Sequence, residues 1–410
     1  MQVLWGIGGM VVLLAIAFLL STNRRAVNLR TVAGALIIQI VFAFIVLYWE
    51  LGRQALQVLT NGVQAVIDTS NEGIQFLFGP VLPDADSGPV FAFQVLPIII
   101  FFASLTSVLY YLGILQFVVN LMGRGLQKAL GTSGPESLSV TSDIFLGPTE
   151  APLTVRPYIE KMTDSELFTV MAGGLASVAG STLVGYSLLG APLNYLLAAA
   201  FMSAPAALLM AKIMMPETEE PESRTPDPED EAVLQEVLDD RNVIDAAARG
   251  AADGLRLALN VGAMLIAFIS LIALLNLILG AIGGLFGFDE LSLQLVLGYV
   301  FAPVAFVIGV PWNEVLDAGN FIGQKVILNE FVAYSNFGPR VDEFSEKTVA
   351  IVTFALAGFA NFGTIAILLG GVGGMAPSRR SQIAQFGIRA LIAGTLANLL
   401  NAAIAGMLVG

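Results

Sequence analysis

Long apolar stretches alternate with short polar segments along the chain. Because about 20 helical residues cross a bilayer, this pattern predicts about eight membrane-spanning helices. Arg24, Arg25 and Arg30 follow the first stretch and no basic residue precedes it, so we expect a retained helix with its N-terminus outside the cytoplasm. With an even number of spans, the C-terminus is also expected outside. The predicted spans are residues 3–20, 32–51, 91–115, 167–189, 193–214, 257–285, 349–369 and 388–408.

Further segments have patterns that do not span. Between residues 52 and 79 apolar positions recur at helical spacing among polar ones, which predicts an amphipathic helix along the interface. Residues 131–161 have basic flanks and too few apolar positions to cross, so they predict a re-entrant hairpin from the cytoplasm with its tip at 143–148. An interfacial helix at 291–308 and a second hairpin at 314–334, entering from outside, are also predicted.

The two spans that follow the hairpins are interrupted by small and polar residues. Gly173, Gly174 and Gly180 lie in the first, and Gly358 and Gly363 lie in the second. Such residues are typical either of close helix packing or of a locally unwound helix whose carbonyls coordinate an ion. The order of span, interfacial helix, hairpin, interrupted span and span occurs twice with opposite orientation. It predicts an inverted repeat, the architecture of secondary transporters.

Composition excludes several classes of protein. Hydrophobic residues make up 56% and charged residues 12% of the 410 residues, whereas soluble domains carry about 25% charged residues. We therefore expect an all-α polytopic membrane protein. The absence of His and Cys removes disulfides, thiolate nucleophiles and imidazole bases, which argues against an enzyme. Most of the net charge of −13 lies between residues 216 and 245, where twelve acids accompany two arginines; this predicts a solvated cytoplasmic linker.

Two carboxylates in apolar surroundings mark the candidate site. Glu150 lies between prolines in the first hairpin, and Glu330 lies in the second. An ionisable group in hydrocarbon normally faces a bundle interior or an aqueous path, so we expect both hairpins to form one pocket. Lys325 is the only nearby cation, which favours a neutral, hydroxylated or amide-bearing solute over an anion. Phe359 and Phe362 provide either a stacking face or simple packing. The polar residues expected in the pocket are Thr149, Glu150, Ser177, Thr182, Asn329, Glu330, Asn361 and Thr364.

Several motifs closely resemble the concentrative nucleoside transporter family. Residues 147–153 match the family pattern Gly-Gln-Thr-Glu-Ala-Pro-Leu except at Pro148. The other motifs are Gly323-Gln324-Lys325, Asn329-Glu330-Phe331-Val332-Ala333-Tyr334, Phe359-Ala360-Asn361-Phe362 and Ala376-Pro377-Ser378-Arg379-Arg380. Because they are spread from residue 147 to residue 380, the chain is identified as a bacterial member of this family.

The resemblance implies a homotrimer in which a scaffold holds a mobile transport domain that contains both hairpins. The implied scaffold comprises residues 1–115 and 257–285, the transport domain comprises 116–214 and 286–410, and the acidic linker with an interfacial segment comprises 215–256. The implied nucleoside site consists of Pro148, Thr149, Glu150, Thr182, Glu330, Phe359, Asn361 and Thr364. The first four of these would meet the nucleobase and the others the ribose. The family's sodium site corresponds to Asp143, Leu146, Ser177 and Val178.

Three departures from the family pattern change the expected chemistry. Pro148 replaces a glutamine that would hydrogen-bond the base, so we expect purines to be tolerated. Asp143 replaces an amide at the ion site, where a carboxylate binds sodium more strongly, takes up a proton, or only caps a helix end. Gly363 replaces a serine near the ribose contacts.

The resemblance therefore implies symport of nucleosides such as uridine or adenosine with sodium or a proton, by an elevator-type movement in the bacterial inner membrane. It implies no other cofactor and no nucleic-acid partner. The alternatives are a carrier of another neutral hydroxylated solute, an intramembrane hydrolase and a channel. A hydrolase needs a nucleophile within reach of a base, and a channel needs a continuous polar lining; neither pattern is present in the spans.

Overall fold

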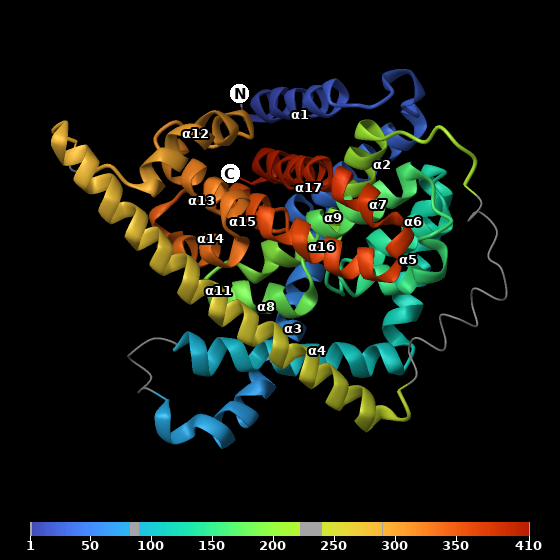
Figure 1. The fold of residues 1–410 in the computed structure, drawn as a ribbon, viewed down its shortest axis with the longest axis horizontal. Coiled ribbons are helices and arrows are strands. Elements are labelled where there is room, and N and C mark those ends of the chain that lie inside the picture. The colour runs from blue at the N-terminus through green and yellow to red at the C-terminus, as the bar shows by residue number, and fades with distance from the viewer. Residues whose placement is uncertain (1, 83–89, 222–239, 289, 410) are drawn as a thin grey trace.

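The described part of the chain consists of helices and the turns between them (Figure 1). The computed structural model describes residues 2–82, 90–221, 240–288 and 290–409. The central part of the predicted acidic linker, residues 222–239, lies outside the described residues. The α-helices are α1 Gln2–Leu19, α2 Leu29–Ala43, α3 Glu50–Phe78, α4 Leu96–Tyr111, α5 Ile114–Leu130, α6 Gly134–Ser142, α7 Asp164–Ala176, α8 Gly180–Leu188, α9 Leu193–Met214, α11 Val243–Leu285, α12 Leu293–Val307, α13 Val315–Ile327, α14 Glu330–Phe337, α15 Glu346–Leu356, α16 Phe362–Met375 and α17 Arg380–Leu408.

Six segments of the described chain are long and apolar enough to cross a membrane. They contain α2, α4, the pair α7–α8, α9, α11 and α17. Shorter apolar helices include α1 and α16, and α16 follows α15 in the chain after an interruption at residues 357–361. This set accounts for the predicted spans, and the prediction of an all-α polytopic membrane protein is confirmed.

Both predicted hairpins are present. Hairpin 1 consists of α6, a turn at residues 143–150 and the 3-10 helix Ala151–Tyr158; hairpin 2 consists of α13 and α14. The Ser133 side chain accepts the backbone N–H of Glu136, and the Glu136 carboxylate accepts that of Ser133 in return. This capping box starts α6. Asn329 caps α14 by accepting the N–H of Val332 at 2.8 Å. The caps pair N–H groups that would otherwise lack partners inside the protein.

The two interrupted spans are broken helices. α7 ends at Ala176 and α8 begins at Gly180, while residues 357–361 separate α15 from α16. Both spans are therefore unwound at their breaks, and the small residues also permit close packing, because a Cβ added at Gly358 would lie 2.3 Å from Asn398 Oδ1. The side chain of Asn361 accepts the N–H of Thr364 at 3.0 Å, which starts α16 after the second break.

α11 begins earlier than the sequence pattern predicted. Its first residue is Val243, whereas the apolar pattern placed the start of this span at residue 257. The Asn242 side chain accepts the N–H groups of Ile244 and Asp245, so it caps a helix whose first turns are polar. Apolar periodicity detects only the later turns of such a helix.

Two other helices have bounds that the sequence analysis did not give. α5 lies where the repeated order of elements expects an interfacial helix, between the span at 91–115 and hairpin 1, and Gly113, with a φ of 76°, turns the chain into it from α4. α17 begins at Arg380 rather than at residue 388, again because its first turn is polar.

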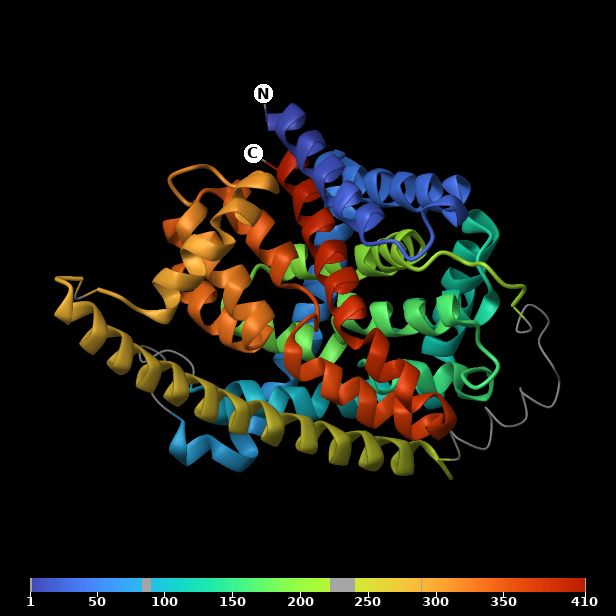
Figure 2. The ribbon, with the colours of Figure 1, turned by 45° about the horizontal axis from the view of Figure 1, so that its top comes forward.

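The helices differ strongly in how far they are covered. α7, α9, α15 and α17 form a central bundle, and α4 packs along α11 on one side of it (Figure 1). In the most apolar stretch of α9, 94% of the residues are buried, against 11% in α11. Figure 2 shows α11 running obliquely past the bundle and projecting beyond it. The apolar surface of α11 is thus free to meet lipid or another protein.

Candidate functional site

The turn of hairpin 1 carries Glu150 and is held between the two copies of the repeat. The N–H of Gly147 donates to Glu150 Oε2 at 3.2 Å, so the carboxylate folds back over the turn. Pro148 packs on α7, where a Cβ added at Gly174 would lie 3.1 Å from Pro148 Cβ. Thr149 packs on α16, where a Cβ added at Gly371 would lie 2.8 Å from Thr149 Cγ2. Glycine is needed at both positions to admit the turn.

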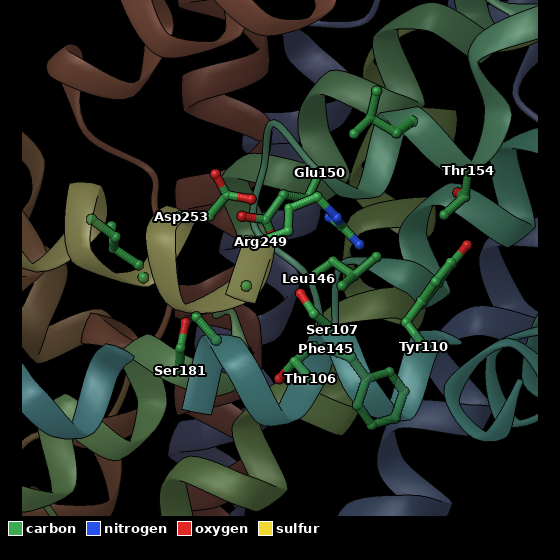
Figure 3. A pocket seen from close by; sticks show the side chains of 15 residues that line it. Thr106, Ser107, Tyr110, Phe145, Leu146, Glu150, Thr154, Ser181, Arg249 and Asp253 are labelled. Atoms are coloured by element: carbon green, nitrogen blue, oxygen red, sulfur yellow. The ribbon is translucent and has the colours of Figure 1, made fainter. Parts of the chain in front are cut away.

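A cavity opens beside Glu150 (Figure 3). Its empty volume is about 840 Å³, counting its open mouth. Figure 3 shows Glu150, Arg249 and Asp253 gathered at one end, with Thr106 and Ser181 at the other. The walls come from hairpin 1, α4, α8 and α11. Polar groups converge on it from both sides.

Glu330 lies in a second polar cluster. Its side chain is buried, and Oε1 accepts the hydroxyl of Tyr186 at 3.1 Å while Oε2 accepts the amide of Asn361 at 2.9 Å. Asn361 Oδ1 in turn accepts the hydroxyl of Thr364 at 3.1 Å. Three helices, α8, α14 and α16, thus converge on one carboxylate. The oxygens of Glu330 can accept hydrogen bonds from the hydroxyl groups of a ligand.

Tyr186 is a site residue that the sequence analysis missed. Its ring is fully buried, stacks on Tyr334 at 4.5 Å and meets Phe331 edge-on at 4.7 Å. One signal was available, since Tyr186 follows the predicted site residue Thr182 by four positions, which places both on one helix face. An aromatic residue in an apolar span is otherwise unremarkable in sequence.

The residues of the predicted ion site lie where hairpin 1 meets the first helix break. Asp143 ends α6 and lies against α7, since a Cβ added at Gly173 would be 2.7 Å from Asp143 Oδ2. Ser177 follows one turn after Gly173. Both Asp143 oxygens and Ser177 Oγ are buried without a hydrogen-bond partner in the described chain. Leu146 and Val178 lie in the adjoining non-helical segments.

The backbone and the carboxylate of Asp143 have different surroundings. Asp143 is the C-cap residue of α6, and its backbone N–H donates to the carbonyls of Ser139 and Thr141. Its carboxylate takes no part in this cap and accepts no hydrogen bond in the described chain, so capping alone does not account for the carboxylate. A buried carboxylate without partners, together with the unpartnered hydroxyl of Ser177 one turn after Gly173, is a donor set that suits sodium or a proton.

The structure places the predicted residues in three groups rather than in one pocket. Among the described residues that line the cavity beside Glu150, Glu330 is not included. α8 connects the two clusters, because Ser181 lines the cavity and Tyr186 reaches Glu330. The three groups are Pro148 with Thr149 and Glu150; Asp143 with Leu146, Ser177 and Val178; and Glu330 with Asn361 and Thr364.

The remaining predicted residues lie in or near the helix breaks. Thr182 returns its hydroxyl to the carbonyl of Ala179 at 2.8 Å. Phe359 lies inside the second break, and its N–H donates to the carbonyl of Ser177 at 3.2 Å. Phe362 is 49% exposed, so it does not form part of a closed stacking face here.

Comparison with known proteins covers the chain almost end to end. Residues 195–406 match the family model "Na+ dependent nucleoside transporter C-terminus", residues 8–81 match its N-terminal counterpart, and residues 92–193 match the model "Nucleoside recognition". The nucleoside permease NupC of Helicobacter pylori is 48% identical over 99% of this chain and 98% of its own. The uncharacterized transporter YutK of Bacillus subtilis is 56% identical over the full length of both chains.

Solved structures agree with this relationship. The structure of CNTnw in an inward-facing substrate-bound state is 51% identical, with a TM-score of 0.94, covering 100% of this chain and 98% of that one. The mouse sodium/nucleoside cotransporter 1 is 40% identical over 98% of this chain and 63% of its own. These relatives are transporters and permeases rather than enzymes. The chain belongs to the concentrative, Na+-dependent nucleoside transporter family.

Proposed function

We propose that this chain carries nucleosides into the cell by symport with a cation. The observation that supports this most directly is the buried carboxylate of Asp143, whose oxygens lack hydrogen-bond partners in the described chain. A carboxylate held in this way needs a cation or a proton, because an isolated charge is costly in a low-dielectric interior. A cation bound by Asp143 and Ser177 would join hairpin 1 to the first helix break.

The two polar clusters would recognise opposite ends of a nucleoside. Glu330 and Asn361 offer a carboxylate and an amide, which suit the vicinal hydroxyls of a ribose. Thr149, Glu150 and Thr182, with Pro148 packed behind the turn, would face the nucleobase. In the present arrangement Tyr186 occupies one oxygen of Glu330 and Asn361 the other, so nucleoside binding would add to or rearrange this cluster.

Sodium is our proposal for the coupling ion, with a proton as its competitor at Asp143. Two findings support sodium, namely the family models named for Na+ dependence and the buried, unpartnered hydroxyl of Ser177, which lies one turn after the glycine that Asp143 packs against. Replacement of the family amide by Asp143 adds a titratable group, which gives a proton the same place to bind. Gradients of the two ions imposed separately distinguish these cases.

Transport would proceed by movement of both hairpins relative to α4 and α11. The cavity beside Glu150 supports this, because residues of hairpin 1 and α8 line it together with residues of α4 and α11. The exposed apolar face of α11 would be covered in a homotrimer, as the family resemblance implies. We place the protein in the bacterial inner membrane, with both termini outside and the acidic linker in the cytoplasm.

The decisive experiment uses purified protein in proteoliposomes. Labelled uridine and labelled adenosine are offered under an inward sodium gradient, an inward proton gradient, or neither. Accumulation above the external concentration under one gradient supports symport, and the gradient that drives it identifies the ion. Equilibration without accumulation under both gradients would contradict cation coupling, and absence of saturable uptake of either nucleoside would contradict the substrate class.

A further inference from the structure

A single buried amide joins the two broken helices. Asn398 of α17 is 1% exposed, and its Nδ2 donates to the carbonyl of Ala176 at 2.6 Å and to that of Ala357 at 2.8 Å. Ala176 is the last residue of α7, and Ala357 is the first residue after α15. The two carbonyls are left without helical partners by the breaks, and one side chain satisfies both.

Lys325 of hairpin 2 holds this amide from the other side. Its Nζ donates to Asn398 Oδ1 at 2.8 Å and to the carbonyl of Ala355 at 3.4 Å. Lys325 is 1% exposed, and no carboxylate lies within 4.0 Å of it among the described residues. The lysine therefore keeps its place by binding Asn398 and the end of α15. In this way hairpin 2 is connected to both breaks through Asn398.

The surroundings of Asn398 leave it no freedom to move alone. A Cβ added at Gly358 would lie 2.3 Å from Asn398 Oδ1 and 2.8 Å from the Ala176 carbonyl oxygen. A Cβ added at Gly394, one turn earlier on α17, would lie 2.8 Å from Leu175 Cβ. Glycine at both positions therefore lets the segments pack closely, and close packing transmits a displacement of one backbone segment to the other, because packed interiors deform little.

Each break carries part of a different proposed site. The first contains Ser177 and Val178, which we assign to the cation, and the second contains Phe359 and Asn361, which we assign to the nucleoside. The breaks also meet directly, since the N–H of Phe359 donates to the carbonyl of Ser177. A cation that orders the first break therefore acts on the second through this backbone bond and through Asn398.

We propose that Asn398, held by Lys325, is the positioning residue that couples cation binding to nucleoside binding. This inference rests on the proposed function and adds the physical route of the coupling. Linkage requires the cation and the nucleoside to raise each other's affinity by the same factor. If Asn398 transmits this coupling, removing its amide reduces the factor by which the cation raises nucleoside affinity and the equal factor by which the nucleoside raises cation affinity. Each ligand still keeps its own direct contacts.

The test variant is Asn398→Asp, which keeps the size and the acceptor for Lys325 but removes both donors to the carbonyls. Its matched control is Asn401→Asp on the same helix. Asn401 is equally buried, but its side chain accepts the amide of Gln39 of α2 at 3.0 Å and makes no hydrogen bond to either break in the described chain. Binding of labelled uridine to the purified, detergent-solubilised protein is measured with and without sodium, at pH 6 and pH 8.

In the wild type we expect the cation to raise uridine affinity by a factor in the usual range of about 5 to 150. Asn398→Asp should reduce this factor to about two or less, and Asn401→Asp should retain it. If the cation raises the uridine affinity of Asn398→Asp as much as that of the wild type, or if both variants lose this effect equally, the role of Asn398 is overturned while the proposed symport stands. If the uridine affinity of the wild type is the same with and without sodium and at both pH values, the proposed symport and the coupling role are both overturned. If Asn398→Asp does not give a folded protein, Lys325→Gln is measured in its place. The cation should again raise uridine affinity only about twofold or less, and a factor equal to that of the wild type would overturn the role of Asn398.

Discussion

Tyr186 of α8 donates a hydrogen bond to Glu330 of α14 across 3.1 Å, and so joins the first repeat to the carboxylate of the second. Both side chains are buried, and the tyrosine ring is fixed by stacking on Tyr334. The orientation of Glu330 in one repeat is therefore set by a residue of the other.

Removing this hydroxyl should weaken nucleoside binding. A hydrogen bond to a charged group contributes about 1.5–3 kcal/mol, so Tyr186→Phe should raise the KM for uridine roughly tenfold or more while maximal uptake changes less. Tyr334→Phe is the matched control, because the Tyr334 hydroxyl donates to the carbonyl of Thr353 and not to Glu330. Equal KM values for Tyr186→Phe and the wild type would show that Glu330 needs no such support.

Neutralising Glu330 should abolish concentrative uptake. Glu330→Gln keeps the shape of the side chain but exchanges one acceptor oxygen for a donor, which then faces the donor Tyr186 or the donor Asn361. We expect no accumulation of uridine in proteoliposomes, together with unchanged elution of the purified protein on size exclusion. Glu314→Gln is the control, because Glu314 binds Ser345 at the exposed end of hairpin 2. Normal accumulation by Glu330→Gln would contradict the assignment of this residue.

The glycine beside Asp143 offers a test of the cation site that leaves the carboxylate in place. A Cβ at Gly173 would lie 2.7 Å from Asp143 Oδ2, so Gly173→Ala should displace the oxygen and lower the apparent cation affinity by about tenfold, or ~1.4 kcal/mol. Gly370→Ala, where an added Cβ meets nothing within 4 Å, should behave as the wild type. The measurement is uridine uptake as a function of the driving cation. An unchanged half-saturating concentration in Gly173→Ala would remove Asp143 from the ion site.

Pro148 should widen the range of accepted bases. The turn that carries it packs against Gly174 and offers no side-chain amide to the base. We expect adenosine to compete with labelled uridine in the wild type, and Pro148→Gln to shift the ratio of the two inhibition constants toward uridine. Failure of adenosine to compete would contradict this expectation.

Asp240 provides a prediction for stability against pH. Its two oxygens accept Nε and a terminal nitrogen of Arg249 at 2.7 Å and 2.6 Å, and these hydrogen bonds lower the pKa of Asp240 below its usual value. A carboxyl whose folded pKa is lowered adds stability above its unfolded pKa of about 3.9, and this is lost as pH falls through the lower folded pKa. The partly exposed pair contributes up to about 1 kcal/mol.

Thermal unfolding of the wild type and of Asp240→Asn from pH 7 to pH 3 measures this contribution. We expect the wild type to be the more stable near pH 7 and the difference to disappear at the acid end. A difference that persists at pH 3 would show that the substitution acts through packing rather than through the ion pair.

The elements that sequence predicted well are those with a local signal. The broken helices follow from clustered small residues, and the hairpins follow from prolines and polar residues in apolar surroundings. Asp143 and Ser177 were anticipated through the family motif, and the structure adds that their side chains lack partners.

The parts that sequence did not predict depend on contacts between distant segments. Asn398 is an ordinary amide in an apolar span until α17 is packed against both breaks, which lie 222 and 41 residues away in the chain. Tyr186 depends likewise on a partner 144 residues away. The separation of Glu150 from the Glu330 cluster also arises from packing, because α8 lies between the two hairpins.

α11 has 43 residues, which gives a rod of about 65 Å at 1.5 Å per residue, whereas the hydrocarbon core is about 30 Å thick. The polar first turns need not lie in the hydrocarbon, but the apolar turns from residue 257 onward are also longer than the core is thick, so the helix must lean from the bilayer normal, and the lean grows as the bilayer thins. The direction in which the hairpins move beside α11 should therefore change with the acyl-chain length of the lipid. Vesicles made from short-chain and long-chain lipids should consequently differ in turnover while nucleoside affinity stays the same.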